Sequence, residues 1–152
     1  MDSIAEKFLT FALGREEYGL PVLKVREIIK VMDITQVPQV PAHVRGVINL
    51  RGRVIPVIDL RLKFGLPWRD YTERTCIIVV DVTSAGMLGV VVDSVSEVVN
   101  VTAADTEDAS ALGACVSTEY LLGLAKVKGT VKILLDLDRL LAADAMVAAR
   151  PS

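Results

Sequence analysis

Short apolar runs separated by turn residues recur along most of the chain. Runs rich in Val, Ile, Phe and Tyr lie between Gly, Pro, Asp and Asn residues. This pattern is typical of the short strands of a β-sandwich or β-barrel rather than of alternating strands and helices. It predicts a mainly β fold, with strands near residues 7–13, 17–22, 34–37, 46–50, 53–58, 74–82, 87–92, 121–126 and 131–136.

Two segments carry the spacing of amphipathic helices. Val22, Val25 and Ile29 are spaced by three and four residues in VLKVREIIKV, which favours one face of a helix. In DLDRLLAADAMVAA an aspartate precedes a run rich in Leu and Ala, as at the start of a capped helix. The second segment is expected to form a helix that closes the chain.

An internal repeat is the most informative feature of the sequence. VRGVINLRGRVIPVIDL (44–60) aligns with LLGLAKVKGTVKILLDL (121–137) at an offset of 77, which pairs two glycines and an Asp-Leu step. Upstream, GLPVLKVREII (19–29) aligns with GVVVDSVSEVV (89–99) at an offset of 70. The difference of seven residues predicts an insertion in the second copy, most simply in the acidic stretch 101–114.

Each copy therefore predicts one β-rich unit that ends in a hairpin and an Asp-Leu exit into a short helix. Units of this size are too small for a generous core and gain stability by packing their open faces together. We expect a first unit at residues 7–70 and a second at 74–148, with approximate boundaries and strands that the units are able to exchange. A groove between them is a usual place for a partner to dock.

Composition and charge exclude several classes of protein. The 152 residues are 52% hydrophobic and 24% charged, which favours a globular chain over a disordered one. Residues 1–75 hold 12 basic and 9 acidic residues and residues 76–152 hold 5 and 10, too small an imbalance for nucleic-acid binding. The N-terminal sequence predicts neither a signal peptide nor a membrane span, so a cytoplasmic protein with no direct membrane insertion is expected.

Candidate catalytic groups are sparse. His43 is the only histidine and has no nucleophile beside it in the sequence, which favours a surface or packing role. Asp136 and Asp138 are explained more simply as helix-capping or strand-end residues than as a catalytic pair. Cys76 and Cys115 form no metal-binding spacing. We therefore expect no catalytic site, cofactor or metal, and a protein that works by binding.

The motifs FLTFALGREEYGLPVLKVREI, VPAHVRGVINLRGRVIPVIDLRLKF, GVVVDSVSEVV and STEYLLGLAKVKGTVKILLDLDRLL closely resemble the CheW-like domain family of chemotaxis coupling proteins. The resemblance runs from about Lys7 to Leu141, and GVINLRGRVIPVIDL is its most specific part. It implies one CheW-like domain over residues 1–152, built from two pseudo-symmetric five-stranded SH3-like barrels on a shared hydrophobic core, with short helices and a C-terminal helix.

The resemblance also implies a non-catalytic adaptor. Its expected partners are the cytoplasmic tip of methyl-accepting chemoreceptors, the CheW-like regulatory domain of the CheA histidine kinase and other CheW-like domains, at membrane-associated receptor arrays. The receptor tip is expected in the groove between the barrels, with Arg51 either bracing the groove or reaching a receptor carboxylate. The implied receptor-binding residues are Val25, Glu27, Gly46, Asn49, Leu50, Arg51 and Gly52.

The kinase-facing surface is implied less directly. Arg45 keeps the family's basic character, whereas Glu107 and Leu112 stand where the family often has a basic residue and an aromatic one. This departure implies altered contacts with neighbouring CheW-like domains. Two alternatives remain open from the sequence: the chain is the regulatory module of a longer kinase or hybrid coupler, or it binds a small molecule in the cleft between the barrels.

Overall fold

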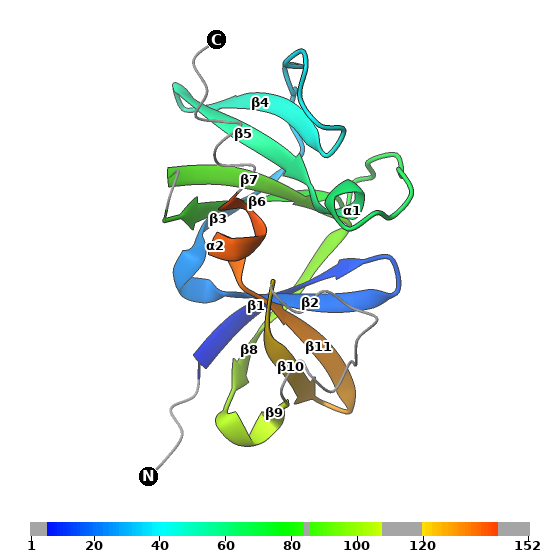
Figure 1. Ribbon diagram of the computed structural model, residues 1–152, viewed down its shortest axis with the longest axis vertical. Helices are drawn as coiled ribbons and strands as arrows, with labels where there is room; N and C mark the ends of the chain where they lie inside the picture. The colour runs from blue at the N-terminus through cyan, green and yellow to red at the C-terminus, as the bar shows by residue number, and fades with distance from the viewer. Residues whose placement is uncertain (1–5, 84–85, 108–119, 143–152) are drawn as a thin grey trace.

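The computed structural model describes residues 6–83, 86–107 and 120–142, which form strands, two 3-10 turns and two short helices. Figure 1 shows these elements stacked along the long axis of the molecule. The strands are β1 (Glu6–Leu13), β2 (Glu16–Pro21), β3 (Val25–Lys30), β4 (Val44–Leu50), β5 (Arg53–Asp59), β6 (Cys76–Val82), β7 (Gly86–Val92), β8 (Ser94–Val101), β9 (Thr106–Glu107), β10 (Leu121–Val127) and β11 (Thr130–Leu135), and the helices are α1 (Leu60–Lys63) and α2 (Leu137–Leu140).

The strands form two sheets that share both halves of the sequence. The order is β3-β6-β7-β5-β4 in one sheet and β8-β1-β2-β11-β10-β9 in the other. Parallel pairing of β5 with β7 and of β2 with β11 joins the halves, since parallel neighbours must come from distant segments. The two halves therefore exchange strands between the sheets, which the expected units at residues 7–70 and 74–148 allowed for.

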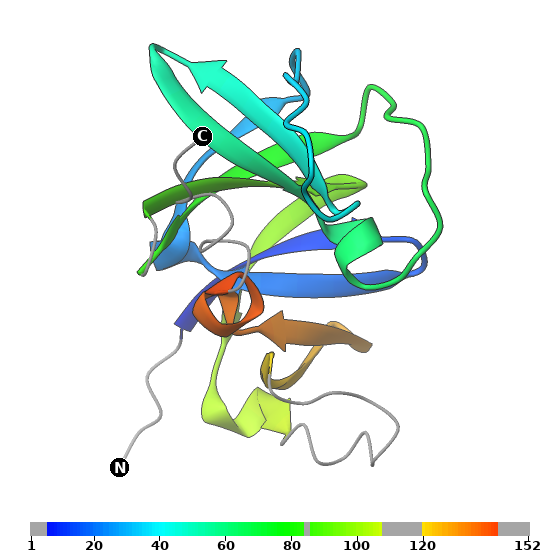
Figure 2. The same cartoon turned by 45° about the horizontal axis from the view of Figure 1, so that its top comes forward.

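Each sheet closes into a barrel. Thr35, which follows β3, bridges to Val47 in β4 at the opposite edge of the same sheet. In the other sheet β9, which follows β8, pairs with β10 through Glu107 and Leu124. We call these the β4–β5 barrel and the β10–β11 barrel after their hairpins, which lie at opposite ends of the molecule (Figures 1 and 2).

Three apolar clusters stabilise this arrangement. Ile48, Ile55, Val57, Ile77, Val79 and Val91 fill the β4–β5 barrel. A smaller cluster, Phe8, Val99, Val101, Ala125 and Leu134, fills the β10–β11 barrel. The largest cluster joins the barrels, with residues from both sheets and both helices, and it includes Leu9, Phe11, Leu13, Leu20, Ile58, Leu60, Ile78, Val80, Val82, Leu88, Val90, Val92, Leu135, Leu137, Leu140 and Leu141. The expected shared hydrophobic core is confirmed.

The repeat found in the sequence is also a structural repeat. Asp59 and Asp136 both cap a four-residue helix, accepting hydrogen bonds from the backbone N–H groups of Leu62 (3.3 Å) and Arg139 (3.2 Å). Both hairpins contain a register shift at the glycine that aligns in the repeat, Gly46 in one and Gly123 in the other. The capping role expected for Asp136 is confirmed. The predicted closing helix begins as α2 and ends at Leu140, and residues 143–149 of the predicted segment lie outside the described residues.

Two expected elements are wrong, and two strands, β8 and the two-residue β9, were missed. The segment with Val22, Val25 and Ile29 at helical spacing forms a 3-10 turn at Val22–Lys24 followed by β3, whose residues alternate in exposure. The predicted strand at 34–37 is reduced to the single bridge at Thr35. Strand β8 was not predicted, although it pairs with β1 along most of its length.

Candidate functional site

The β4–β5 hairpin turns through Arg51 and Gly52. Leu50 and Arg53 pair directly, which leaves a two-residue loop, and both loop residues have positive φ, 53° at Arg51 and 85° at Gly52. These are the dihedrals of a type I′ turn, whose twist matches that of the flanking strands. The side-chain oxygen of Asn49 accepts a hydrogen bond from the Gly52 N–H at 2.9 Å, which further fixes the turn.

Arg51 is held by a carboxylate of its own barrel. Its Nη1 and Nη2 donate to Oε1 and Oε2 of Glu27 in β3, at 2.5 and 2.8 Å. Such a bidentate pair fixes the plane of the guanidinium. The hydrogen bonds from Arg51 lower the pKa of the Glu27 carboxyl, and the carboxylate raises the pKa of Arg51. Of the two roles left open by the sequence, this geometry favours bracing.

The pair is partly solvated and has apolar neighbours on the surface. Side-chain exposure is 70% for Arg51 and 31% for Glu27. Ile28, next to Glu27 in β3, is 42% exposed, and Val54, which pairs with Asn49 across the hairpin, is 70% exposed. Arginine is enriched at protein-binding hot spots, and Ile28 and Val54 add exposed apolar area on the strand of Glu27 and on the hairpin of Arg51. We call Glu27, Ile28, Arg51 and Val54 the arginine hairpin surface.

The other predicted receptor-binding residues shape this surface. Asn49 is exposed, and Leu50 is half-buried against the core of the β4–β5 barrel. Val25 begins β3 and packs against the shared core. Gly46 is buried where β4 passes the backbone of Thr35, with no space for a side chain. All seven predicted residues therefore lie in β3, β4 and the turn after β4, in one sheet.

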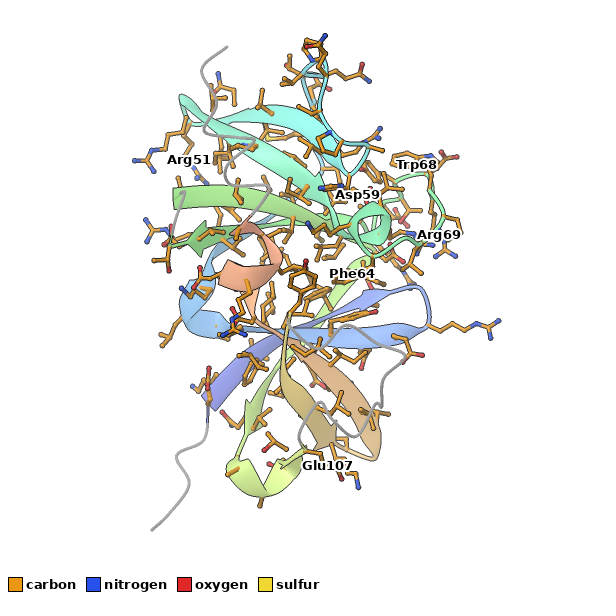
Figure 3. All side chains as sticks on the ribbon, in the orientation of Figure 1. Arg51, Asp59, Phe64, Trp68, Arg69 and Glu107 are labelled. Carbon is orange, nitrogen blue, oxygen red and sulfur yellow. The ribbon has the colours of Figure 1, made fainter. Side chains whose placement is uncertain are left out.

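Aromatic side chains pack in the seam between the barrels. Tyr18 stacks between Phe11 and Phe64, with ring centroids 5.8 and 5.5 Å apart, as part of the shared core. In Figure 3, Arg51 lies on the opposite side of the view from Arg69 and the seam residue Phe64 lies between them. The seven residues all come from one barrel, with Val25 packed against the shared core, and the expected receptor groove between the barrels stays a prediction.

One pocket between the barrels is polar. It measures about 200 Å³ and none of the seven residues lines it. Asp93, between β7 and β8, accepts hydrogen bonds there from the Gly14 N–H at 2.8 Å and from Arg61 Nη1 at 2.7 Å. Tyr71 donates to the buried Asp59 at 2.9 Å. Because these buried groups satisfy one another, the pocket acts as a polar brace between the barrels.

The residues expected at the kinase-facing surface are separated. Arg45 lies over the ring of Trp68, 4.6 Å from its centroid, and Trp68 also contacts Tyr71. Glu107 lies in β9 on the other barrel, paired with Lys126 at 3.2 Å. Leu112 lies outside the described residues. Trp68, which is 45% exposed, was missed because the segment after α1 carries no periodic pattern.

The contact between Glu27 and Arg51 was also missed, although the sequence contained a signal for it. The two residues are 24 positions apart, but their counterparts in the repeat, Glu97 and Lys128, keep the same charges. Within the described ranges, no group of three His, Cys, Asp or Glu residues could hold a metal ion. The same part of the chain contains no helix of the length and apolarity needed to cross a membrane.

A five-stranded and a six-stranded sheet, each closed into a barrel and fused through one core, define a double-barrel domain. The family model of the CheW-like domain matches residues 7–145. The chemotaxis protein CheW of Klebsiella aerogenes is 39% identical over 145 residues, covering 95% of this chain and 87% of that protein. The CheW of Treponema pallidum is 31% identical over 140 residues, covering 88% and 81%.

A solved structure agrees with these relatives. The crystal structure of the scaffolding protein TtCheW from Thermoanaerobacter tengcongensis superposes with a TM-score of 0.83 at 33% identity, covering 91% of this chain and 93% of that one. The chain belongs to the CheW-like domain family. Its role is that of a chemotaxis adaptor or scaffold.

Proposed function

We propose that this chain couples methyl-accepting chemoreceptors to the CheA histidine kinase without catalysing a reaction. The receptor's cytoplasmic helical hairpin docks on the arginine hairpin surface, and the regulatory domain of CheA docks elsewhere on the barrels. The protein accordingly works in the cytoplasm, at receptor arrays. The observation that carries the receptor site is the bidentate pair between Arg51 and Glu27, since it holds a cation in fixed geometry at an exposed hairpin tip.

The partner surface for CheA and for other CheW-like domains involves Arg45 and, on the other barrel, Glu107. Two observations support this assignment. The cation–π contact with Trp68 fixes Arg45 beside an exposed aromatic ring, and Trp and Arg are enriched at binding hot spots. Glu107 presents an exposed carboxylate in place of a basic residue, which favours a partner with a cation at that point. Leu112 is included in this proposal from its sequence position alone.

The test is a binding titration with a receptor signalling-tip fragment. Arg51→Asn removes the guanidinium but keeps the turn, because Asn-Gly is the preferred pair for a type I′ hairpin. We expect about ten- to a hundredfold weaker binding, as for truncation of a hot-spot arginine. Arg74→Asn removes an exposed arginine from the loop before β6 and serves as the matched control. An unchanged affinity of Arg51→Asn, at an unchanged melting temperature, contradicts the receptor assignment.

A double-variant cycle separates bracing from direct contact. If Glu27 braces Arg51, Glu27→Gln weakens receptor binding, and adding Arg51→Asn to it weakens binding little further. If Arg51 instead leaves Glu27 to reach a receptor carboxylate, Glu27→Gln frees the guanidinium and binding is kept or strengthened. The pairing observed in the free protein leads us to expect the first result.

A further inference from the structure

The β10–β11 hairpin repeats the geometry of the arginine hairpin surface at the other end of the molecule. Its loop residues Lys128 and Gly129 have φ values of 53° and 80°, against 53° and 85° in the first hairpin. Val127 and Thr130 pair directly on either side, so this loop is also a type I′ turn. The two turns are equivalent in sequence, in length and in backbone conformation.

The ion pair of the first hairpin is repeated as well. Lys128 Nζ lies 3.1 Å from Oε1 of Glu97 in β8, and side-chain exposure is 73% and 43%. Glu97 is the residue that aligns with Glu27 at the offset of 70. In both copies the carboxylate lies at an irregularity in the strand pairing and reaches the hairpin tip of its own copy.

Exposed apolar residues recur at the same two positions. Val98, the counterpart of Ile28, is 54% exposed, and Val131, the counterpart of Val54, is 49% exposed. Neither side chain belongs to an apolar core of the described structure. Apolar residues at both equivalent positions add exposed area that a partner can cover.

We infer that Glu97, Val98, Lys128 and Val131 form a second docking surface for the same class of partner as the first, the tip of an antiparallel helical hairpin. This inference rests on the proposed function of the arginine hairpin surface. The repeat supports one occupant for both surfaces, because each hairpin tip holds a cation paired with a carboxylate of an earlier strand and exposes apolar residues at the same two positions.

The second surface binds more weakly than the first. Lys128 makes one ion-pair contact with Glu97, whereas Arg51 makes two parallel hydrogen bonds to Glu27. A single contact on a flexible lysine leaves more side-chain freedom to be lost on binding. Because the hairpins lie at opposite ends of the long axis (Figures 1 and 2), a chain with both surfaces occupied links two receptor hairpins.

The stoichiometry of receptor-fragment binding tests this inference. Calorimetric titration of the full chain should give two sites, the second about three- to a hundredfold weaker. Lys128→Asn, which keeps the turn, combined with Val131→Ser should leave one site of unchanged affinity. Arg51→Asn should instead weaken the tight site about ten- to a hundredfold and leave the second unchanged. Arg74→Asn is the control, and melting temperatures confirm that each variant is folded.

Three outcomes overturn the inference. If the wild type binds the receptor fragment at one site, and the Lys128 and Val131 changes do not affect that binding, the second surface does not exist. The proposed function then still stands. If the Lys128 and Val131 changes abolish binding to a second copy of the chain or to a CheA regulatory domain, and the receptor stoichiometry is unchanged, the surface belongs to a different partner. Absence of any receptor binding by the wild type overturns the proposed function and the inference together.

Discussion

Replacing Gly46 with alanine should destabilise the protein strongly, because β4 passes the backbone of Thr35 too closely for a side chain. A Cβ at position 46 would lie 2.0 Å from the Thr35 carbonyl oxygen, and the residue has φ of +139°. An acceptable C···O contact is about 3.3 Å or more, so the two segments would have to separate by roughly an ångström. That separation breaks the pair of hydrogen bonds between Thr35 and Val47, at 2.8 and 2.9 Å.

The cost can be worked out from these contacts. Two backbone hydrogen bonds contribute about 0.5–1.5 kcal/mol each. A non-glycine residue held in an unfavourable backbone conformation costs about 1–3 kcal/mol. We therefore expect Gly46→Ala to lower the free energy of unfolding by roughly 2–6 kcal/mol. The loss is large for a domain of this size, because total stabilities are about 5–15 kcal/mol.

The repeat supplies a matched control. At Gly123, with φ of +154°, an added Cβ would lie 3.0 Å from the Glu107 carbonyl oxygen, in a strand of only two residues. Gly123→Ala should cost only the conformational strain, about 1–3 kcal/mol. Urea denaturation followed by circular dichroism measures both values. Equal losses at the two glycines would refute the argument from the close approach of Thr35.

Two further predictions concern ion pairs away from the hairpin tips. Burial raises the pKa of Asp138, but hydrogen bonds from Thr83 and Lys24 outweigh that effect and hold the pKa below its usual value. A depressed carboxyl pKa contributes stability above the unfolded value of about 3.9 and loses it as the pH falls further. Asp138→Asn should therefore cost about 1 kcal/mol at pH 7 and less at pH 3, and an equal cost by urea denaturation at both would contradict this. Lys132 is buried and paired with Glu17. Lys132→Met should change stability by less than about 1 kcal/mol, whereas Glu17→Gln should cost about 1–3 kcal/mol, and the reverse order in thermal denaturation would contradict the pairing.

The sequence alone predicted the features of the fold that depend on short-range chemistry or on the repeat. Alternating apolar residues placed both hairpins within one or two residues, because turn glycines and strand periodicity are local signals. The offset of 77 correctly paired Gly46 with Gly123 and Asp59 with Asp136 in structural role. The seven candidate receptor-binding residues also lie in one sheet, although their binding role stays a prediction.

Which strands the halves exchange could not be predicted in the same way. It depends on parallel pairing of β2 with β11 and of β5 with β7, which joins residues far apart in the chain. A repeat indicates that two segments have the same structure. It does not indicate whether the strands of each segment pair with one another or with strands of the other copy. The contact between Arg51 and Glu27 was missed for a similar reason. It joins β3 to the hairpin after β4, and a long loop separates these strands in the sequence.

The two misread strands have a common cause, and it bears on function. Strand β3 alternates in exposure, but Ile28 puts an apolar residue on its outward face and so conceals the period of two. Strand β8 carries Val98 at the equivalent position, with the same effect. Local pattern and fold disagree where a residue is selected for something other than folding. In both copies the apolar residue that conceals the strand pattern stands at the same position, next to a carboxylate paired with a hairpin cation. Selection for partner binding at both ends of the molecule would leave this pattern in the sequence.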